Sequence, residues 1–233
     1  MEMTVLRILG IDTSGKIASV AITDENKLLC EKILYTNLTH SQIIMPMVQE
    51  MMNACDLNFD DIDAIAVANG PGSYTGLRIG IAAVKGICLG RPDIKCAGIS
   101  TLAALSYNCS AFVGKIIPVM KARPNVVYVG EYLSDGEKLT CTAEDKVCNE
   151  AEFFTALDLS ERILLTGDYC TEIKEKYFSD NENIVCAGKN LRLQRASCLC
   201  SALENDDSYF TNPEKLEVAY LQATKAEKDK AHS

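Results

Sequence analysis

The sequence lacks several patterns that mark membrane, secreted and metal-binding proteins. No apolar run approaches the roughly 20 residues that cross a bilayer, and Glu2 and Arg7 interrupt the start, where a secretory signal needs continuous apolar residues. Histidine occurs only at His40 and His232, and Ile44 stands at the i+4 position after His40, so no helical histidine pair can begin a metal site. We therefore expect a cytoplasmic protein without a membrane segment or a metal of its own.

Basic residues are also scarce relative to acidic ones. The formal net charge is −9 and the pI is near 4.8. Binding to nucleic acid without help needs concentrated Lys and Arg, so we expect any contact with RNA to depend on a partner. The 11 cysteines include no Cys-x-x-Cys pair, and most lie in apolar segments. We interpret them as reduced thiols of the core rather than as zinc ligands or disulfides.

The pattern of the first hundred residues is typical of an α/β lobe. Apolar runs predict a meander of three strands, then an alternation of helices and strands: strands at 6–11, 18–23 and 28–35, a helix from 39 or 41 to 55, a strand at 62–68, a helix at 75–89, a strand at 96–99 and a helix from 100 to 107. The 62–68 strand runs into a glycine-rich turn, which leads directly into the next helix. This is a strand, glycine turn, helix unit.

The remaining residues repeat that order on a smaller scale. A hairpin is predicted at 115–132, followed by a helix at 150–157, a strand at 162–166, a helix at 169–178 and a strand at 184–187. The echo favours two related lobes with mixed sheets flanked by helices, as in the actin-like, Hsp70-like and ribonuclease H-like folds. We expect a first lobe over 1–107, a smaller second lobe over 108–212, and a C-terminal helix and tail over 213–233.

Two segments could carry chemistry. The first is Asp12, Thr13 and Ser14, which close the first strand where a ligand could approach the sheet edge. The second is the 70–76 turn, where a helix start with free amides could hold an anion; its candidate residues are Gly70, Gly72, Ser73 and Thr75. Both segments also have plain structural interpretations, as a tight turn held by side chains and as an ordinary helix start.

The second segment carries a resemblance to a known family. The run from Gly70 to Gly80 (GPGSYTGLRIG), then AAVKG over 82–86 and GISTL over 98–102, is similar to the signature of the TsaB family, formerly YeaZ. LGIDTS over 9–14 and HSQ over 40–42 match in the same order. The second lobe shows only Ala122-Arg123 with Val127-Tyr128, and Lys121 stands where the family usually has Asp. That departure counts against a ligand role for the hairpin.

The resemblance implies a non-catalytic scaffold subunit in tRNA modification. Its partner TsaD would transfer threonylcarbamoyl to N6 of adenosine 37 in transfer RNAs that read codons beginning with A. It implies homodimers when the chain is alone, a heterodimer with TsaD, the ATPase TsaE as a further partner, and contact with tRNA only within the complex. ATP and metal are expected on the partner subunits, so this chain needs no cofactor.

The same resemblance implies pairing through the helices at 41–55 and 75–89. The apolar stripe of the first helix is wider than one sheet face requires, and we predict that His40, Ile44, Met47, Val48, Met51, Leu77, Ile81 and Val84 form the partner interface. On this hypothesis Met47→Asp weakens pairing and leaves the fold intact. The alternatives are that the apolar residues belong to the intramolecular core and that His40 is a capping or surface residue at the start of a helix.

Enzymatic alternatives stay open as rivals. A sugar-kinase-like phosphotransferase needs an acidic base and a glycine pair in the second lobe, but Gly167-Asp168 supplies one glycine. A metallopeptidase needs two histidines, and a serine hydrolase needs a Gly-x-Ser-x-Gly turn, which this sequence lacks. A freestanding nucleotide sensor that uses Asp12 and the 70–76 turn is the third alternative.

Overall fold

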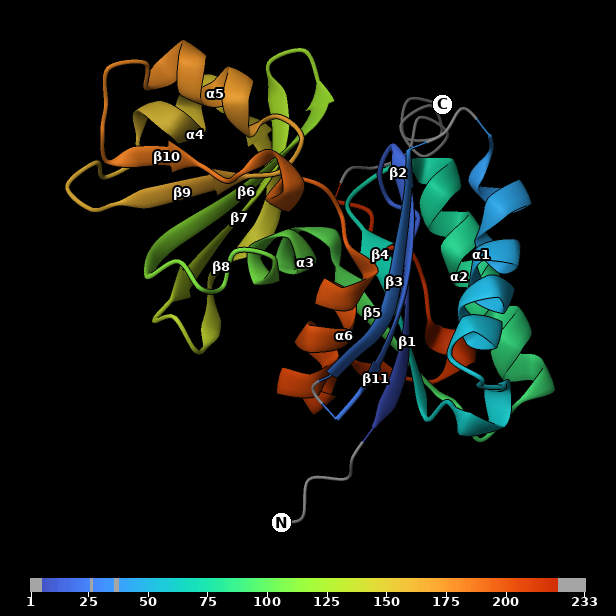
Figure 1. Ribbon diagram of the computed structural model, residues 1–233. Coiled ribbons are helices and arrows are strands. Elements are labelled where there is room, and N and C mark those ends of the chain that lie inside the picture. Colours follow the sequence, from blue (N-terminus) through green and yellow to red (C-terminus); the bar gives the residue numbers. More distant parts are fainter. Residues whose placement is uncertain (1–5, 26, 36–37, 222–233) are drawn as a thin grey trace, which may run out of the picture.

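The computed structural model describes residues 6–25, 27–35 and 38–221, and it consists of two lobes (Figure 1). The first lobe holds a six-stranded sheet in the order β11-β5-β4-β1-β2-β3, built from β1 (Arg7–Asp12), β2 (Ile17–Asp24), β3 (Lys27–Tyr35), β4 (Ala64–Gly70), β5 (Lys95–Ser100) and β11 (Phe210–Thr211). Strands β1, β4 and β5 are parallel, while β2, β3 and β11 pair antiparallel with their neighbours.

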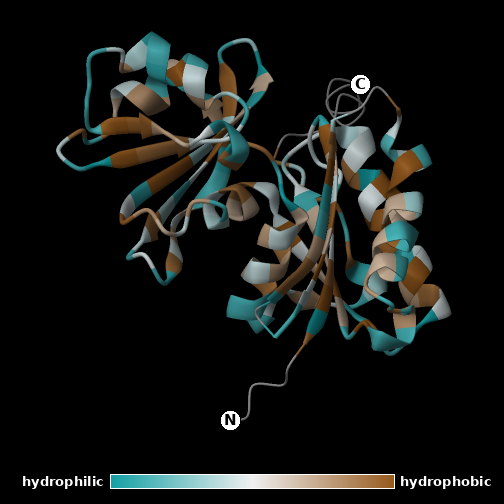
Figure 2. Cartoon of the chain, in the orientation of Figure 1, coloured by the Kyte–Doolittle hydropathy of each residue, from teal (hydrophilic) through white to brown (hydrophobic). Residues whose placement is uncertain are grey.

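Helices cover both faces of this sheet. One face packs against α1 (His40–Ala54) and α2 (Tyr74–Gly90), and the other against α6 (Ala196–Asn205) (Figure 1). The central strands read as continuous apolar runs because both of their sides are buried. Figure 2 shows the result, with apolar strands inside and hydrophilic loops outside.

The second lobe repeats the scheme of the first. Its sheet has the order β10-β9-β6-β7-β8, built from β6 (Gly114–Arg123), β7 (Val126–Ser134), β8 (Leu139–Asn149), β9 (Ile163–Thr166) and β10 (Ile184–Cys186). In each lobe a three-stranded antiparallel meander is extended by two parallel strands. The expected α/β architecture of two lobes, each with a mixed sheet flanked by helices, is confirmed.

Three further helices complete the second lobe and its junction with the first. One face of the sheet packs against α4 (Glu150–Thr155) and α5 (Cys170–Tyr177), and the other against α3 (Thr101–Tyr107), which leads from the first lobe into the second. Short 3-10 helices lie at Phe59–Asp61, Lys189–Leu191, Asp207–Tyr209 and Pro213–Lys215. Among the helices of the described segments, none is both long and apolar enough to cross a membrane.

The chain returns to the first lobe near its end, which differs from the expected division. Helix α6 and strand β11 fall within the expected second lobe of 108–212, yet both pack on the first sheet. The backbone of α6 crosses the sheet so closely that a Cβ on Gly10 would overlap the carbonyl oxygen of Ala196. The first lobe is therefore built from both ends of the chain. The expected tail over 213–233 is described only as far as residue 221.

Candidate functional site

The end of β1 forms a buried polar turn. Asp12, Thr13 and Ser14 are all at most 1% exposed. The amide and the hydroxyl of Ser14 both donate to Asp12 Oδ1, at 2.8 and 2.6 Å. The second carboxyl oxygen, Oδ2, is buried and has no hydrogen-bond partner within the described part of the chain. Burial raises the pKa of Asp12 above its usual range, because the charged form loses its hydration.

The glycine-rich turn after β4 lies directly against this polar turn. Ser73 caps the start of α2, where its hydroxyl accepts from the Gly76 amide at 3.2 Å. The Ser73 amide donates to the Ser14 carbonyl at 2.7 Å, and the Thr13 hydroxyl donates to the Gly76 carbonyl at 2.7 Å. The structure therefore brings the two predicted segments together. Their polar groups form hydrogen bonds with each other, where a ligand would have been expected to accept or donate them.

Glycine is required where these two turns meet. A Cβ on Gly72 would overlap the Ser14 carbonyl oxygen, and one on Gly76 would overlap that of Thr13. Gly70, at the end of β4, has a φ of 132°, and Thr75 is exposed on the first turn of α2. The amides of Ser73 and Gly76, two of the donors that an anion at this helix start could use, already have partners in this chain. We call this contact between residues 12–14 and 70–76 the joined turns.

Two side chains secure the same region from outside the predicted segments. His40 begins α1, and its Nε2 lies 3.0 Å from the Gly15 carbonyl oxygen, a geometry in which the ring donates. Gln194, which is 2% exposed, lies against Gly15, where a Cβ would be 2.6 Å from its Oε1. No local sequence pattern marks Gln194, because the residue that it contacts, Gly15, lies far away in the sequence. The space beside Gly15 is filled by protein.

The apolar residues predicted for the partner interface are core residues instead. All seven are at most 6% exposed: Ile44, Met47, Val48, Met51, Leu77, Ile81 and Val84. The stripe on α1 is wide because the helix packs on the sheet and beside α2 in one cluster. The interface prediction therefore needs correction for these residues, and Met47→Asp would put a charge into the core and destabilise the fold. His40 is partly exposed but is held by Gly15.

The exposed sides of these two helices carry a different set of residues. On α1, Met45 is 38% exposed, and Pro46 and Gln49 beside it are also exposed. On α2, Ala82 and Gly86 are small and exposed, Leu89 near the end of the helix is 88% exposed, and a Cβ on Gly86 would meet nothing within 4 Å beyond its own helix and chain neighbours. This outer face was missed because the sequence argument followed the apolar stripe of each helix, and Met45 lies beside that stripe.

The second-lobe hairpin holds Lys121 next to an acid from another loop. The Lys121 amide donates to Asp168 Oδ1 at 3.3 Å, and its ammonium group lies 4.7 Å from the centre of the Tyr169 ring. Burial raises the pKa of Asp168. Asp168, in the loop after β9, thus places a carboxylate next to Lys121, the position where the family usually has Asp. Nowhere in the described ranges do three or more His, Cys, Asp or Glu side chains gather as metal ligands would.

Comparison with known proteins identifies close relatives. A family model described as "TsaD: tRNA N6-adenosine threonylcarbamoyltransferase" matches residues 35–223. A Bacillus subtilis (strain 168) protein named "tRNA threonylcarbamoyladenosine biosynthesis protein TsaB" is 33% identical over 175 residues, which cover 75% of this chain and 76% of that protein. The Escherichia coli (strain K12) protein of the same name is 32% identical over 158 residues, covering 62% of this chain and 65% of its own length.

Solved structures share the fold. A structure described as similar to peptidase YEAZ, from Pseudomonas aeruginosa, superposes with a TM-score of 0.80 at 22% identity, covering 93% of this chain and 100% of that one. A second, described as YeaZ from the same organism, gives a TM-score of 0.77 at 22% identity over the same shares. At this level of identity the two structures show a common architecture.

Proposed function

Because the chain belongs to the TsaB family, we propose that it is a non-catalytic accessory subunit in the formation of N6-threonylcarbamoyladenosine at position 37 of transfer RNAs that read codons beginning with A. It stabilises and activates the TsaD subunit, works beside the ATPase TsaE, and forms homodimers when alone. ATP and metal are held by the partner subunits. With a net charge of −9, the chain contacts tRNA only within the complex.

The observation that supports a scaffold over an enzyme is the pair of joined turns. A nucleotide phosphate at this point would need free amides at the start of α2 and space beside the end of β1. Here the Ser73 amide is 2.7 Å from the Ser14 carbonyl oxygen, and Gly76 contacts the backbone of Thr13. Opening the site would cost those hydrogen bonds and would separate buried polar groups. The arrangement supports an ATPase-like frame whose phosphate position is closed by the protein itself.

The surface proposed for pairing is the outer face of α1 and α2. The two helices lie side by side on the side of the first lobe away from the second (Figure 1). Met45 supplies an adaptable apolar side chain, and the small residues Ala82 and Gly86 let the backbone of a partner helix approach closely. This set replaces the buried residues of the sequence prediction.

Reconstitution tests the role. Purified TsaD and TsaE with tRNA, ATP and threonylcarbamoyl adenylate, the donor of the transferred group, are assayed for the modified nucleoside by mass spectrometry, with and without this chain. We expect product only when the chain is present. Calorimetry of the isolated chain with ATP tests the rival sensor, and micromolar affinity without partners would favour that rival. Equal product in the absence of the chain would overturn the proposal.

Variants separate pairing from folding. We expect Met45→Asp to abolish co-elution with TsaD on gel filtration and to leave the circular dichroism spectrum unchanged, because the side chain lies on the outer face. Leu133→Asp is the matched control, since Leu133 is 47% exposed on β7 in the second lobe. Loss of co-elution in both variants, or in neither, would contradict the assignment of the surface.

A further inference from the structure

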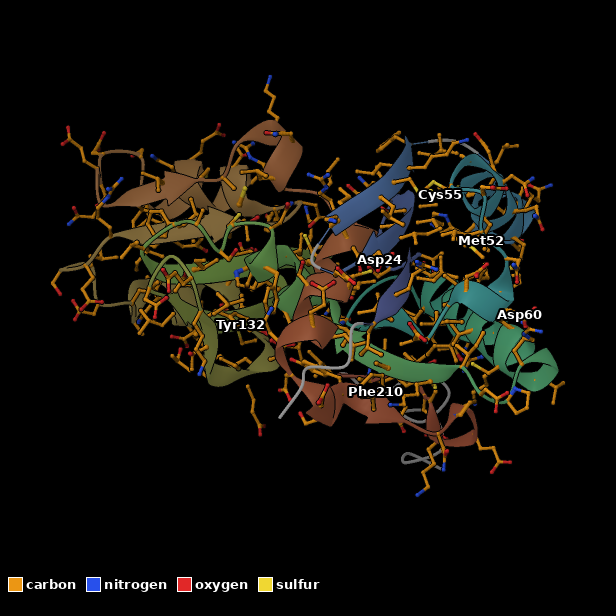
Figure 3. All side chains as sticks on the ribbon, turned by 60° about the horizontal axis from the view of Figure 1, so that its bottom comes forward. Asp24, Met52, Cys55, Asp60, Tyr132 and Phe210 are labelled. Atoms are coloured by element: carbon orange, nitrogen blue, oxygen red, sulfur yellow. The ribbon has the colours of Figure 1, made fainter. Side chains whose placement is uncertain are left out.

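Two of the free cysteines face each other across the joint between α1 and the edge strand β3. Cys30 lies on β3 and Cys55 follows the last residue of α1, and their Sγ atoms are 3.1 Å apart. That separation is a thiol–thiol contact, about 1 Å longer than a covalent disulfide. Figure 3 shows Cys55 in the space between the blue strands and the teal helix. The fold thus brings together two thiols that are 25 positions apart in the sequence.

The pair is accessible enough to react. Both cysteines are partly exposed, whereas Cys88, Cys96, Cys109, Cys170, Cys198 and Cys200 are buried. Cys141 is exposed, and its recorded hydrogen bond goes to the Ala143 carbonyl. The Cys55 thiol donates to the Cys30 sulfur, and desolvation together with this neighbouring thiol raises the pKa of Cys30 to about 12, which makes Cys30 a poor nucleophile at neutral pH. That arrangement assigns the nucleophile to Cys55.

The surrounding structure already holds the two elements in register. Lys32, two residues after Cys30 on β3, forms an ion pair with Glu50 on α1. Cys30 also packs against the apolar cluster that includes Met51 and Met52 at the end of the same helix. These contacts hold β3 and the end of α1 together beside the two thiols, so that the sulfur atoms must approach by only about 1 Å to bond.

We propose that Cys30 and Cys55 form an oxidisable dithiol site that closes to an intramolecular disulfide when the chain meets a hydroperoxide. The Cys55 thiolate attacks one peroxide oxygen, the O–O bond breaks, and Cys55 becomes a sulfenic acid while the other oxygen leaves as water or alcohol after taking a proton. The Cys30 sulfur then attacks the sulfenic sulfur, the S–O bond breaks, and hydroxide leaves as water with the Cys30 proton. Two thiols are oxidised by two electrons and one peroxide is reduced.

The bond would tie the end of α1 to β3 and close the chain from 30 to 55 into a loop. Disulfides in reducing compartments are commonly transient and responsive to oxidants. The inference is independent of the proposed role in tRNA modification, because it rests on the contact between the two thiols.

Peptide mapping tests the site. The full chain is treated with hydrogen peroxide, remaining thiols are alkylated, and the protein is digested with trypsin without reduction. Cys30 is the sole cysteine of the tryptic peptide 28–32, and Cys55 is the sole cysteine of the peptide 33–78. We expect these two peptides to appear joined, with a mass about 2 Da below their sum, and to separate after dithiothreitol.

Control variants and a second pair sharpen the result. Cys55→Ser and Cys30→Ser should each abolish the joined peptide, while Cys141→Ser should retain it, and circular dichroism confirms that each variant is folded. Cys186 also lies near another cysteine, since its thiol donates to the Cys170 carbonyl at 3.3 Å, and those residues fall in peptides 163–174 and 177–189. Joining of that pair alone, or oxidation of the wild type without any joined 28–32 and 33–78, would overturn the proposal.

Discussion

Replacing Gly76 with alanine tests whether the joined turns are as tightly packed as the structure shows. Gly76 lies in the first turn of α2 and faces the end of β1. An added Cβ would overlap the carbonyl oxygen of Thr13 and would also lie 3.2 Å from the Cβ of Ser73. The obstructing atom belongs to the backbone, so rotation of a side chain cannot relieve the overlap. The start of α2 must move away from the sheet.

The cost follows from three contributions. Overpacking a well-filled site destabilises by about 1–3 kcal/mol. Moving the helix lengthens the bonds from Ser73 to Ser14 and from Thr13 to Gly76, each 2.7 Å and each contributing about 1 kcal/mol. The higher helix propensity of alanine offsets about 1 kcal/mol. We expect a net loss of roughly 2–4 kcal/mol in the free energy of unfolding.

Gly86→Ala is the matched control on the same helix. Gly86 is exposed, and a Cβ there would meet nothing within 4 Å outside its own helix and chain neighbours, so we expect a gain of about 0.5–1 kcal/mol from propensity alone. Urea unfolding followed by circular dichroism at 222 nm measures both variants. If Gly76→Ala changes stability by less than about 0.5 kcal/mol, or if both variants shift in the same direction, the reasoning fails.

Two further substitutions probe carboxyl groups, the buried Asp12 and the half-buried Asp145. Burial raises the pKa of Asp12, so the native state binds its proton more tightly than the unfolded chain does, and the ionised carboxyl costs stability increasingly as pH rises above about 4. Asp12→Asn keeps an acceptor for Ser14, and its stability relative to wild type should rise from pH 4 to pH 7; a difference independent of pH would contradict this. Asp145 accepts from the buried Tyr132 hydroxyl at 2.9 Å and from Ser100, so Asp145→Ala should lose about 2–3 kcal/mol in thermal or urea unfolding, and Asp145→Asn clearly less.

The elements of the first lobe could be predicted from sequence because their signals are local. The predicted helix from 39 or 41 to 55 forms from His40 to Ala54 with Thr39 as its N-cap, and Ser100 caps α3 as expected. Strands β1, β2 and β4 were visible because burial on both faces leaves unbroken apolar runs. Capping residues and apolar runs depend on a few neighbouring residues, so a single sequence displays them.

The elements that were missed depend on distant contacts. Strand β8 has no buried residue and reads as a polar segment, and it is a strand because it pairs with β7 at the edge of the sheet. Helix α6 is short, and its start is fixed by Ser19, whose hydroxyl accepts from the Ala196 amide, and by Glu31, which bonds Arg195 and Ser197. Those partners lie more than 160 positions away in the sequence, so no local pattern could predict these contacts.

The sequence indicated which two turns lie near each other, but it did not indicate whether they leave room for a ligand. Glycines and hydroxyls mark where a chain turns sharply beside a sheet edge, and the structure does bring 12–14 and 70–76 together. Whether such turns leave room for a ligand depends on distances of about 1 Å between backbone atoms, which residue types alone do not encode. The predicted interface residues on α1 and α2 were wrong for a different reason. Periodicity identifies which side chains are apolar, but it does not tell whether the rest of the chain covers them.

The path of the chain explains why the joined turns leave no open space beside the end of β1. The segment that returns from the second lobe must reach α6 across the sheet, and it passes the end of β1 on the way. Gln194 lies on this segment and packs on Gly15, and Ala196 begins the helix against Gly10. The segment that leads into α6, whose apolar residues complete the hydrophobic core of the first lobe, thus also closes the turn after Asp12. Clearing that turn for a ligand would disturb the entry to α6, so the stability of the lobe opposes an open ligand site beside Asp12.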